Sequence, residues 1–439
     1  MTGFAGQGLS LEQAPPLSIP MSFFLVAPAA AILSGILLAT EGGSVLVIGW
    51  TPATIALTHL GTLGFLASVM LGALFQMAPV LGGYPVGRVR SAHAVQVGLV
   101  LGVAALVSGL LWDTPEFVFF AIAVLFSTLS FFLVLLGLAL RRAVVKNDTV
   151  KGMVVALWFL GAGAGMGVWM AHGFAGMSFP GPRSTWVQVH LTLGLLGWVG
   201  GLLMAISWQL VPMFYLTPGF GAGQRKWSRR VLVSSLVATA LVPLLEGFQI
   251  LDASFSTRTA IIAASPAGLV VWVVHPILVI RQLSTRRRKR VDPSKNFWLF
   301  GMSVAPVVAC LAVLAHASPD PRWAMAFGWL AVWGWAGIVA HGMLTRIAPF
   351  LVWFHRFSPL VGREPVPTLQ KILPAAIARR SLWVHAVTAV VGIVAIWTTQ
   401  DIFARATGIL LGLTGLHLGY VLIRVLRFVP SSQRATPGT

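Results

Sequence analysis

The sequence has few charged residues and almost no cysteine. Only 9% of its 439 residues are charged, whereas soluble domains carry about 25%. This scarcity excludes a soluble globular enzyme and a charged, disordered protein. The single cysteine, Cys310, excludes an internal disulfide and any iron–sulfur or zinc site built from several thiolates.

Apolar residues are abundant instead: 57% of the chain is hydrophobic, and its mean hydropathy is +0.87. A bilayer-spanning helix needs about 20 mostly apolar residues. Twelve segments qualify, at 19–40, 52–80, 93–113, 116–140, 152–175, 185–215, 230–249, 259–281, 296–318, 322–354, 381–398 and 403–425. We therefore predict an all-α polytopic membrane protein with one transmembrane domain, 19–425, between tails at 1–18 and 426–439.

Basic residues favour one side of the predicted bundle. Most of the 30 Lys and Arg residues fall in loops after even-numbered segments or in the C-terminal tail, as with Arg88, Arg141 and Arg287. The other loops carry acids such as Glu41 and Asp113. Short cytoplasmic loops retain positive charge, so we expect both termini in the cytoplasm and a bacterial-type inner membrane. The net charge of +19 then reflects topology, and nucleic acid is not an expected partner.

The second, sixth and tenth segments share a pattern. Each contains Gly, an aromatic residue, any residue and a small residue, then Gln or Arg followed three positions later by Pro. The prolines are Pro79, Pro212 and Pro349, with periods of 133 and 137 residues. Small residues at such spacing also serve ordinary helix packing in lipid. Read as a repeat, the pattern predicts three pseudo-threefold arcs of four helices.

The ten histidines are the main candidates for chemistry, because ionisable residues inside a membrane normally face the bundle interior. Imidazole is also a usual ligand of heme and copper. Helix direction places His59, His172, His190 and His316 toward the outer side, and His341 and His417 deeper. The remaining four are expected in the inner half or at the cytoplasmic interface: His93, His275, His355 and His385.

The twelve-segment, three-arc pattern resembles subunit I of the heme-copper oxidase superfamily, which includes cytochrome oxidases and nitric oxide reductases. The stretch from Thr58 to Pro79 is similar to the second helix of oxidase-like membrane proteins, and the heme protein NnrS is a second relative to consider. The resemblance implies a heme b held by His59 and His341, with His417 as a substitute ligand. His190 and His316 are candidate ligands of a second metal or heme, with copper as a possible metal.

The oxidase copper site is incomplete in this sequence. Its helix 6 histidine would be followed four residues later by a tyrosine, but His190 is followed by Gly194. Its histidine pair on helix 7 has no counterpart in residues 230–258. Dioxygen reduction at a heme–copper pair is therefore not expected, and the catalytic residues stay unassigned.

Four polar residues at depth complete the candidates. Arg346 replaces Gln76 and Gln209 of the other two repeats, and could serve a heme propionate or an anionic substrate group. It could equally reach the cytoplasmic interface with its long side chain. Gln76, Gln209 and Glu246 are candidates for a polar pathway, although Glu246 could simply lie at the outer interface.

The first functional hypothesis is a heme-binding protein of the oxidase fold without a complete copper site. It would act in electron transfer or in nitric oxide and respiratory metabolism, with a cytochrome or other redox subunit as partner. The thirteen methionines and the scattered histidines keep open a transporter or assembly factor for copper or heme. A membrane anchor subunit of a redox complex is a third possibility.

Overall fold

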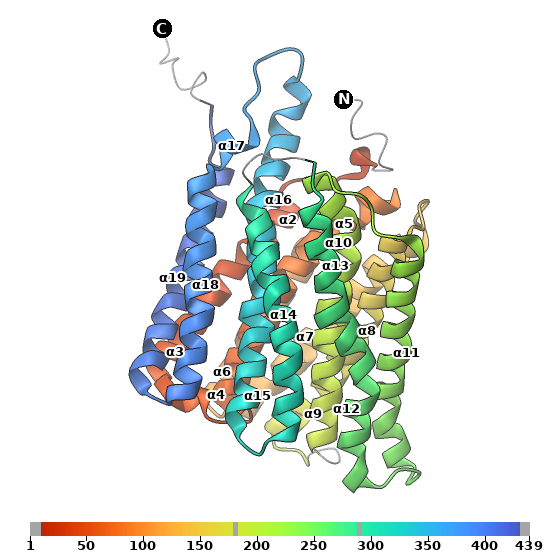
Figure 1. Ribbon diagram of the computed structural model, residues 1–439, viewed down its shortest axis with the longest axis vertical. Helices are drawn as coiled ribbons and strands as arrows, with labels where there is room; N and C mark the ends of the chain where they lie inside the picture. The colour runs from red at the N-terminus through yellow and green to blue at the C-terminus, as the bar shows by residue number, and fades with distance from the viewer. Residues whose placement is uncertain (1–9, 179–182, 288–291, 431–439) are drawn as a thin grey trace.

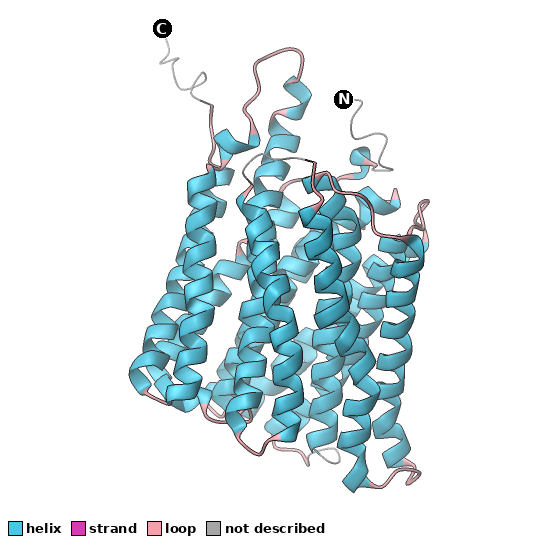
Figure 2. Cartoon of the chain, in the orientation of Figure 1, coloured by secondary structure: helices cyan, strands magenta, loops and turns pink. Residues whose placement is uncertain are grey.

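The structure is a computed structural model that describes residues 10–178, 183–287 and 292–430. These residues form helices joined by turns and loops, with no strand among them (Figure 2). Twelve helical rods are long and apolar enough to cross a membrane. The chain is thus a multi-pass membrane protein, and all twelve predicted segments are confirmed.

The twelve rods are numbered here as spans 1 to 12. Several consist of consecutive helices, and three of these also contain an eight-residue π-helical segment. Spans 1 to 6 are α2 (Ser18–Phe24), α3 (Val26–Glu41) and η2 (Gly42–Leu46); α4 (Pro52–His59), η3 (Leu60–Ala67) and α5 (Ser68–Gly82); α6 (Val89–Leu111); α7 (Pro115–Arg141); α8 (Asp148–Ala171) and η4 (His172–Ala175); and α9 (Arg183–Thr192), η5 (Leu193–Gly200) and α10 (Gly201–Tyr215).

Spans 7 to 12 complete the bundle. They are α11 (Ala222–Gly247); α12 (Ala253–Leu269), η6 (Val270–Val274) and α13 (His275–Ser284); α14 (Pro293–Ala317); α15 (Pro321–Trp329), η7 (Leu330–Gly337) and α16 (Ile338–Arg356); α18 (Ala375–Thr398); and α19 (Asp401–Leu426). Three short elements lie outside the spans: η1 (Leu11–Gln13), η8 (Ser358–Leu360) and α17 (Leu369–Ile372).

Spans 2, 6 and 10 form the centre of the bundle. In their most apolar windows, 83%, 72% and 72% of the residues are buried, against 61% or less in each of the other nine spans. Around them, α6 packs on α7, α11 on α12 and α18 on α19 (Figure 1). The last span, α19, packs along α3 and closes the ring. The structure therefore has the expected three arcs, with nine outer spans around three central ones.

Small residues let the first and last spans approach closely. A Cβ added at Gly408 of α19 would lie 2.6 Å from the carbonyl oxygen of Gly35 on α3. A Cβ at Gly415 would lie 2.7 Å from the carbonyl oxygen of Pro28. Side chains at these positions would separate the two helices, so glycine is what allows the ring to close.

The three central spans share an irregularity at equivalent positions. The π-helical segments η3, η5 and η7 are each eight residues long, and their first residues are Leu60, Leu193 and Leu330. These starts repeat at the same intervals as the sequence pattern. Because π-helical hydrogen bonds run from residue i to i+5, each segment interrupts the regular ladder, and such segments are frequent at functional sites.

The two ends of the bundle differ in charge. The end where span 1 begins and span 12 ends carries the loops with Arg88, Arg141 and Arg225, and is called the basic end. It lies at the top of Figure 1, with α2 and α17. The loops at the opposite end carry Glu41, Asp113 and other acids.

Candidate functional site

His59 and His190 meet between two of the central spans. His59 is the last residue of α4, directly before η3, and His190 lies in α9, three residues before η5. Their ring centroids are 6.3 Å apart, and the ring planes differ by 24°. The structure thus brings together a predicted heme ligand and a predicted ligand of a second metal or heme.

Each of these rings is anchored through Nδ1 to a backbone carbonyl. His59 Nδ1 lies 2.8 Å from the oxygen of Ile55, and His190 Nδ1 lies 2.9 Å from the oxygen of Gly163 on α8. A carbonyl can only accept, so in the neutral rings Nδ1 carries the proton and Nε2 holds the free lone pair. Metal-binding histidines are normally oriented in this way.

The separation of the two rings suits one iron between them. A metal lies about 2.0 Å from a coordinating imidazole nitrogen, which itself lies about 1.1 Å from the ring centroid, so opposed ligands have centroids about 6 Å apart. The observed centroid distance is 6.3 Å. A heme iron with two imidazole ligands is therefore compatible with the donors and with their spacing.

Glycines shape the surroundings of His190. A Cβ at Gly167 of α8 would lie 2.9 Å from Cε1 of His190, so a side chain there would press on the ring. A Cβ at Gly194, about one turn after His190 on the same span, would have no atom within 4 Å. Space for a side chain is therefore left beside Gly194, whereas none is left beside Gly167.

A second histidine pair lies in the third arc. His341 Nδ1 on α16 is 2.9 Å from His385 Nδ1 on α18, and His385 Nε2 is 3.0 Å from the carbonyl oxygen of Trp333 in η7. The carbonyl accepts from His385 Nε2, so neutral His385 has an unprotonated Nδ1. His341 Nδ1 must then donate, and this leaves the lone pair of His341 on Nε2.

The surroundings of His341 are closed, in contrast to those of His190. Its side chain is fully buried, and the Phe297 ring centroid lies 5.4 Å from its own. His341 Nε2 is enclosed and has no hydrogen-bond partner within the described ranges. His417, the predicted substitute ligand, is half-buried on α19 and its Nδ1 lies 3.0 Å from the hydroxyl of Ser381.

His59 and His341 are not brought together. His59 directly precedes η3, whereas His341 comes four residues after the last residue of η7. Since η3 and η7 occupy equivalent places, the two histidines lie at different depths. The partner of His59 is His190, and that of His341 is His385.

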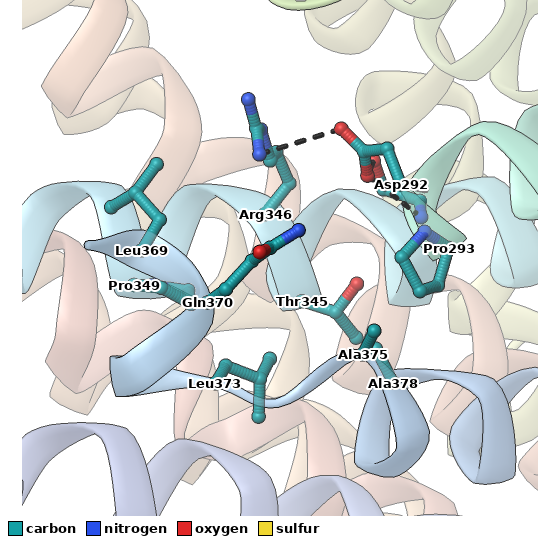
Figure 3. Close-up of a pocket in the computed structure, with 11 residues that line it drawn as sticks. Asp292, Pro293, Thr345, Arg346, Pro349, Leu369, Gln370, Leu373, Ala375 and Ala378 are labelled. Atoms are coloured by element: carbon teal, nitrogen blue, oxygen red, sulfur yellow. Dashed lines mark hydrogen bonds and ion pairs between the residues drawn. The ribbon is translucent and has the colours of Figure 1, made fainter. Parts of the chain in front are cut away.

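Arg346 is held by an acid at the basic end. Its Nη1 lies 3.4 Å from Asp292 Oδ2 (Figure 3), and its guanidinium carbon lies 5.1 Å from the ring centroid of Phe214. Ser294 donates its hydroxyl to Asp292 at 2.6 Å. These residues adjoin a cavity of about 50 Å³ that Thr345 also lines. Such a volume admits water and is far too small for a heme.

The other predicted site residues lie apart. His316 is exposed on α14, Gln76 is buried on α5, and Gln209 is half-buried on α10. Glu246 is half-buried one residue before the end of α11. In the part of the chain that the structure describes, no hydrogen bond joins Gln76, Gln209 and Glu246 to one another, and neither Gln76 Oε1 nor Glu246 Oε2 has a partner.

Two of the four histidines expected in the inner half or at the cytoplasmic interface are buried inside the bundle. His385 is fully buried and His275 is 4% exposed. His275 Nε2 lies 3.3 Å from the Ser207 hydroxyl. The sequence does contain a signal for His385, because Ser381, Thr388 and Gly392 share its helical face at spacings of four, three and four residues.

No family model matches the chain, and no curated protein sequence is significantly similar to it. Within residues 10–178, 183–287 and 292–430, no group of three or more His, Cys, Asp or Glu side chains could hold a metal ion. The functional argument therefore rests on the paired histidines and their surroundings.

Proposed function

We propose that this protein is a heme-binding membrane electron-transfer protein with an oxidase-like arrangement of helices. His59 and His190 would together hold one heme b. The observation that supports this most directly is their centroid separation of 6.3 Å, with both Nδ1 atoms committed to backbone carbonyls.

The ligand set favours electron transfer over catalysis. A bound heme would supply one-electron chemistry, and His59 and His190 would hold it through their imidazole nitrogens. The chain's contribution is to fix the tautomer of each ring, through the carbonyls of Ile55 and Gly163. Because both histidines would hold the heme, dioxygen reduction is not part of the proposal.

The proposal assigns the site to the outer half of a bacterial inner membrane, with both termini in the cytoplasm. His59 is seven residues from Pro52, where span 2 begins at the end opposite the basic end. At about 1.5 Å per residue this is about 10 Å of helix. A cytochrome or other redox subunit that docks at this end could therefore exchange electrons with the site.

The test is a reduced-minus-oxidised visible spectrum of the detergent-purified protein from a heme-sufficient host, with a pyridine hemochrome assay. We expect about one low-spin heme b per chain. His59→Ala and His190→Ala should each lose the heme or convert it to a high-spin form.

His172→Ala is the matched control. Its Nδ1 also lies 2.8 Å from a carbonyl one turn back, on Val168, but His172 has no histidine neighbour in the described residues. It should keep a wild-type spectrum. His341→Ala distinguishes a heme held by His59 and His190 from one held by His59 and His341, the pair that the oxidase resemblance implies. A low-spin heme that survives both His59→Ala and His190→Ala, or no heme at all, would contradict the proposal.

A further inference from the structure

A large groove lies between α3 and α6, on the face of span 2 that they flank. Its volume is about 930 Å³. Leu33 and Ile36 of α3, Val100 and Val103 of α6, and Leu60 and Gly64 of η3 are among the residues that line it. Leu33 and Ile36 are each 53% exposed, so the groove is open to lipid. It contains neither His59 nor His190.

The groove has the depth of one lipid leaflet. It follows α3 from Glu41 at the end opposite the basic end to Val26, which is about 22 Å at 1.5 Å per residue. One leaflet with its headgroup region is about 20–22 Å thick. At about 30 Å³ for a water-sized group, the volume suits about thirty non-hydrogen atoms. One acyl chain with a polar headgroup is of that size.

The rim of the groove is acidic. Glu41 and Asp113 line it, and no Lys or Arg does. Both are exposed, and neither forms an ion pair with another described residue. At the same end of the bundle, Asp320 and Asp401 are instead each paired with an arginine at 2.5 Å. The rim therefore has two free carboxylates that would repel an anionic headgroup and attract an ammonium group.

We propose that this groove binds a phospholipid with a primary-amine headgroup, of the phosphatidylethanolamine type. The ammonium group lies at the carboxylates of Glu41 and Asp113, and one acyl chain occupies the groove along α3 and α6. The second chain remains in the bilayer. This site is independent of the proposed heme.

Ser68 distinguishes this ligand from a quinone. Its side chain is 0% exposed, lies at the inner end of the groove, and its hydroxyl has no partner within the described ranges. An acyl chain has no acceptor for this hydroxyl, whereas the ring carbonyl of an isoprenoid quinone would accept from it. Binding of an amine lipid should therefore be unaffected by Ser68→Ala, whereas a bound quinone should be lost from that variant.

The experiment is native mass spectrometry and lipid extraction of the protein purified in mild detergent from a host with amine and anionic phospholipids. We expect about one amine phospholipid per chain, enriched over its share of the membrane. The double variant Glu41→Gln, Asp113→Asn should lower its occupancy about tenfold. Ala29→Phe should displace it, because Ala29 is an exposed residue of the groove wall.

Two control variants match these changes. Glu116→Gln removes an exposed acid three residues from Asp113 that does not line the groove, and Ala123→Phe adds a ring to an exposed site on α7 outside it. Both should retain the lipid, and size-exclusion profiles should show that all variants are folded. Three outcomes would each overturn the proposal. They are enrichment of an anionic lipid, unchanged lipid occupancy in the double variant Glu41→Gln, Asp113→Asn, and a bound quinone that is lost in Ser68→Ala. The heme spectrum reports on the other proposal separately.

Discussion

Gly167→Ala should displace the proposed heme ligand, His190, without changing the ligand itself. The added Cβ would lie 2.9 Å from Cε1 of His190, where ordinary contacts begin near 3.4 Å. The ring must therefore move by about 0.5 Å, whereas metal–ligand distances tolerate only about 0.2 Å. Losing a group that orients a metal-binding histidine typically weakens metal binding about 10- to 100-fold, and we expect an effect of the same order from displacing the ring.

The assay is heme content per chain together with the rate of heme transfer to a soluble heme-binding acceptor. Gly167→Ala should retain less heme than the wild type and release it about 10- to 100-fold faster. The residual heme should show a partly high-spin spectrum. The effect should be confined to the heme, because the added methyl group meets only this side chain closely.

Gly165→Ala on the same helix is the matched control. Its Cβ would have no atom within 4 Å, and both substitutions gain the same helix propensity of up to about 1 kcal/mol. Gly165→Ala should therefore bind heme as the wild type does. Equal heme retention and spectra in the two variants would refute the placement of His190 as a ligand.

Three further predictions concern stability, each measured by thermal unfolding in detergent. Asp292→Asn should destabilise the protein by about 1–3 kcal/mol because it leaves the mostly buried Arg346 unpaired, whereas the exposed Glu364→Gln should have little effect. Gly408→Ala should cost about 1–3 kcal/mol because its Cβ meets backbone atoms of α3, and Gly412→Ala, whose Cβ meets nothing within 4 Å, should not. Hydrogen bonds from Arg322 lower the pKa of Asp320, so their stabilisation is present above the ordinary pKa and is lost as pH falls through the lowered one. Arg322→Gln should reduce this acid-dependent loss to the part that depends on the backbone N–H of residue 322, and an unchanged pH profile would contradict the assignment.

The membrane spans could be predicted from sequence because the bilayer restricts the choice of structure. Backbone groups in hydrocarbon must be hydrogen-bonded internally, so each long apolar segment must be a helix. The repeat around Gly64, Gly197 and Gly334 also identified the three central spans in advance, since close packing needs small residues at the same places. Exact starts were less predictable: α6 begins at Val89 rather than at residue 93, because its first turn extends into the polar interface.

The histidine partners could not be predicted in the same way. Counting residues on an ideal helix gives a side chain's face only if every turn has 3.6 residues. The segments η3, η5 and η7 contain wider turns, and one extra residue rotates the side chains that follow by about 100°. His341 comes after such a segment while His59 comes before one, so counting residues along the sequence does not give the direction in which each side chain points.

By itself the sequence determined the twelve helices, their three-arc repeat and the residue types available for chemistry, because these follow from local hydrophobicity and composition. Only the tertiary structure decided that His59 faces His190, that His341 faces His385, and that Arg346 is neutralised by Asp292. These pairings depend on the rotation and sliding of whole helices against one another. That relative placement is set by many packing contacts at once, such as the close approach of α3 and α19, and no single segment encodes it.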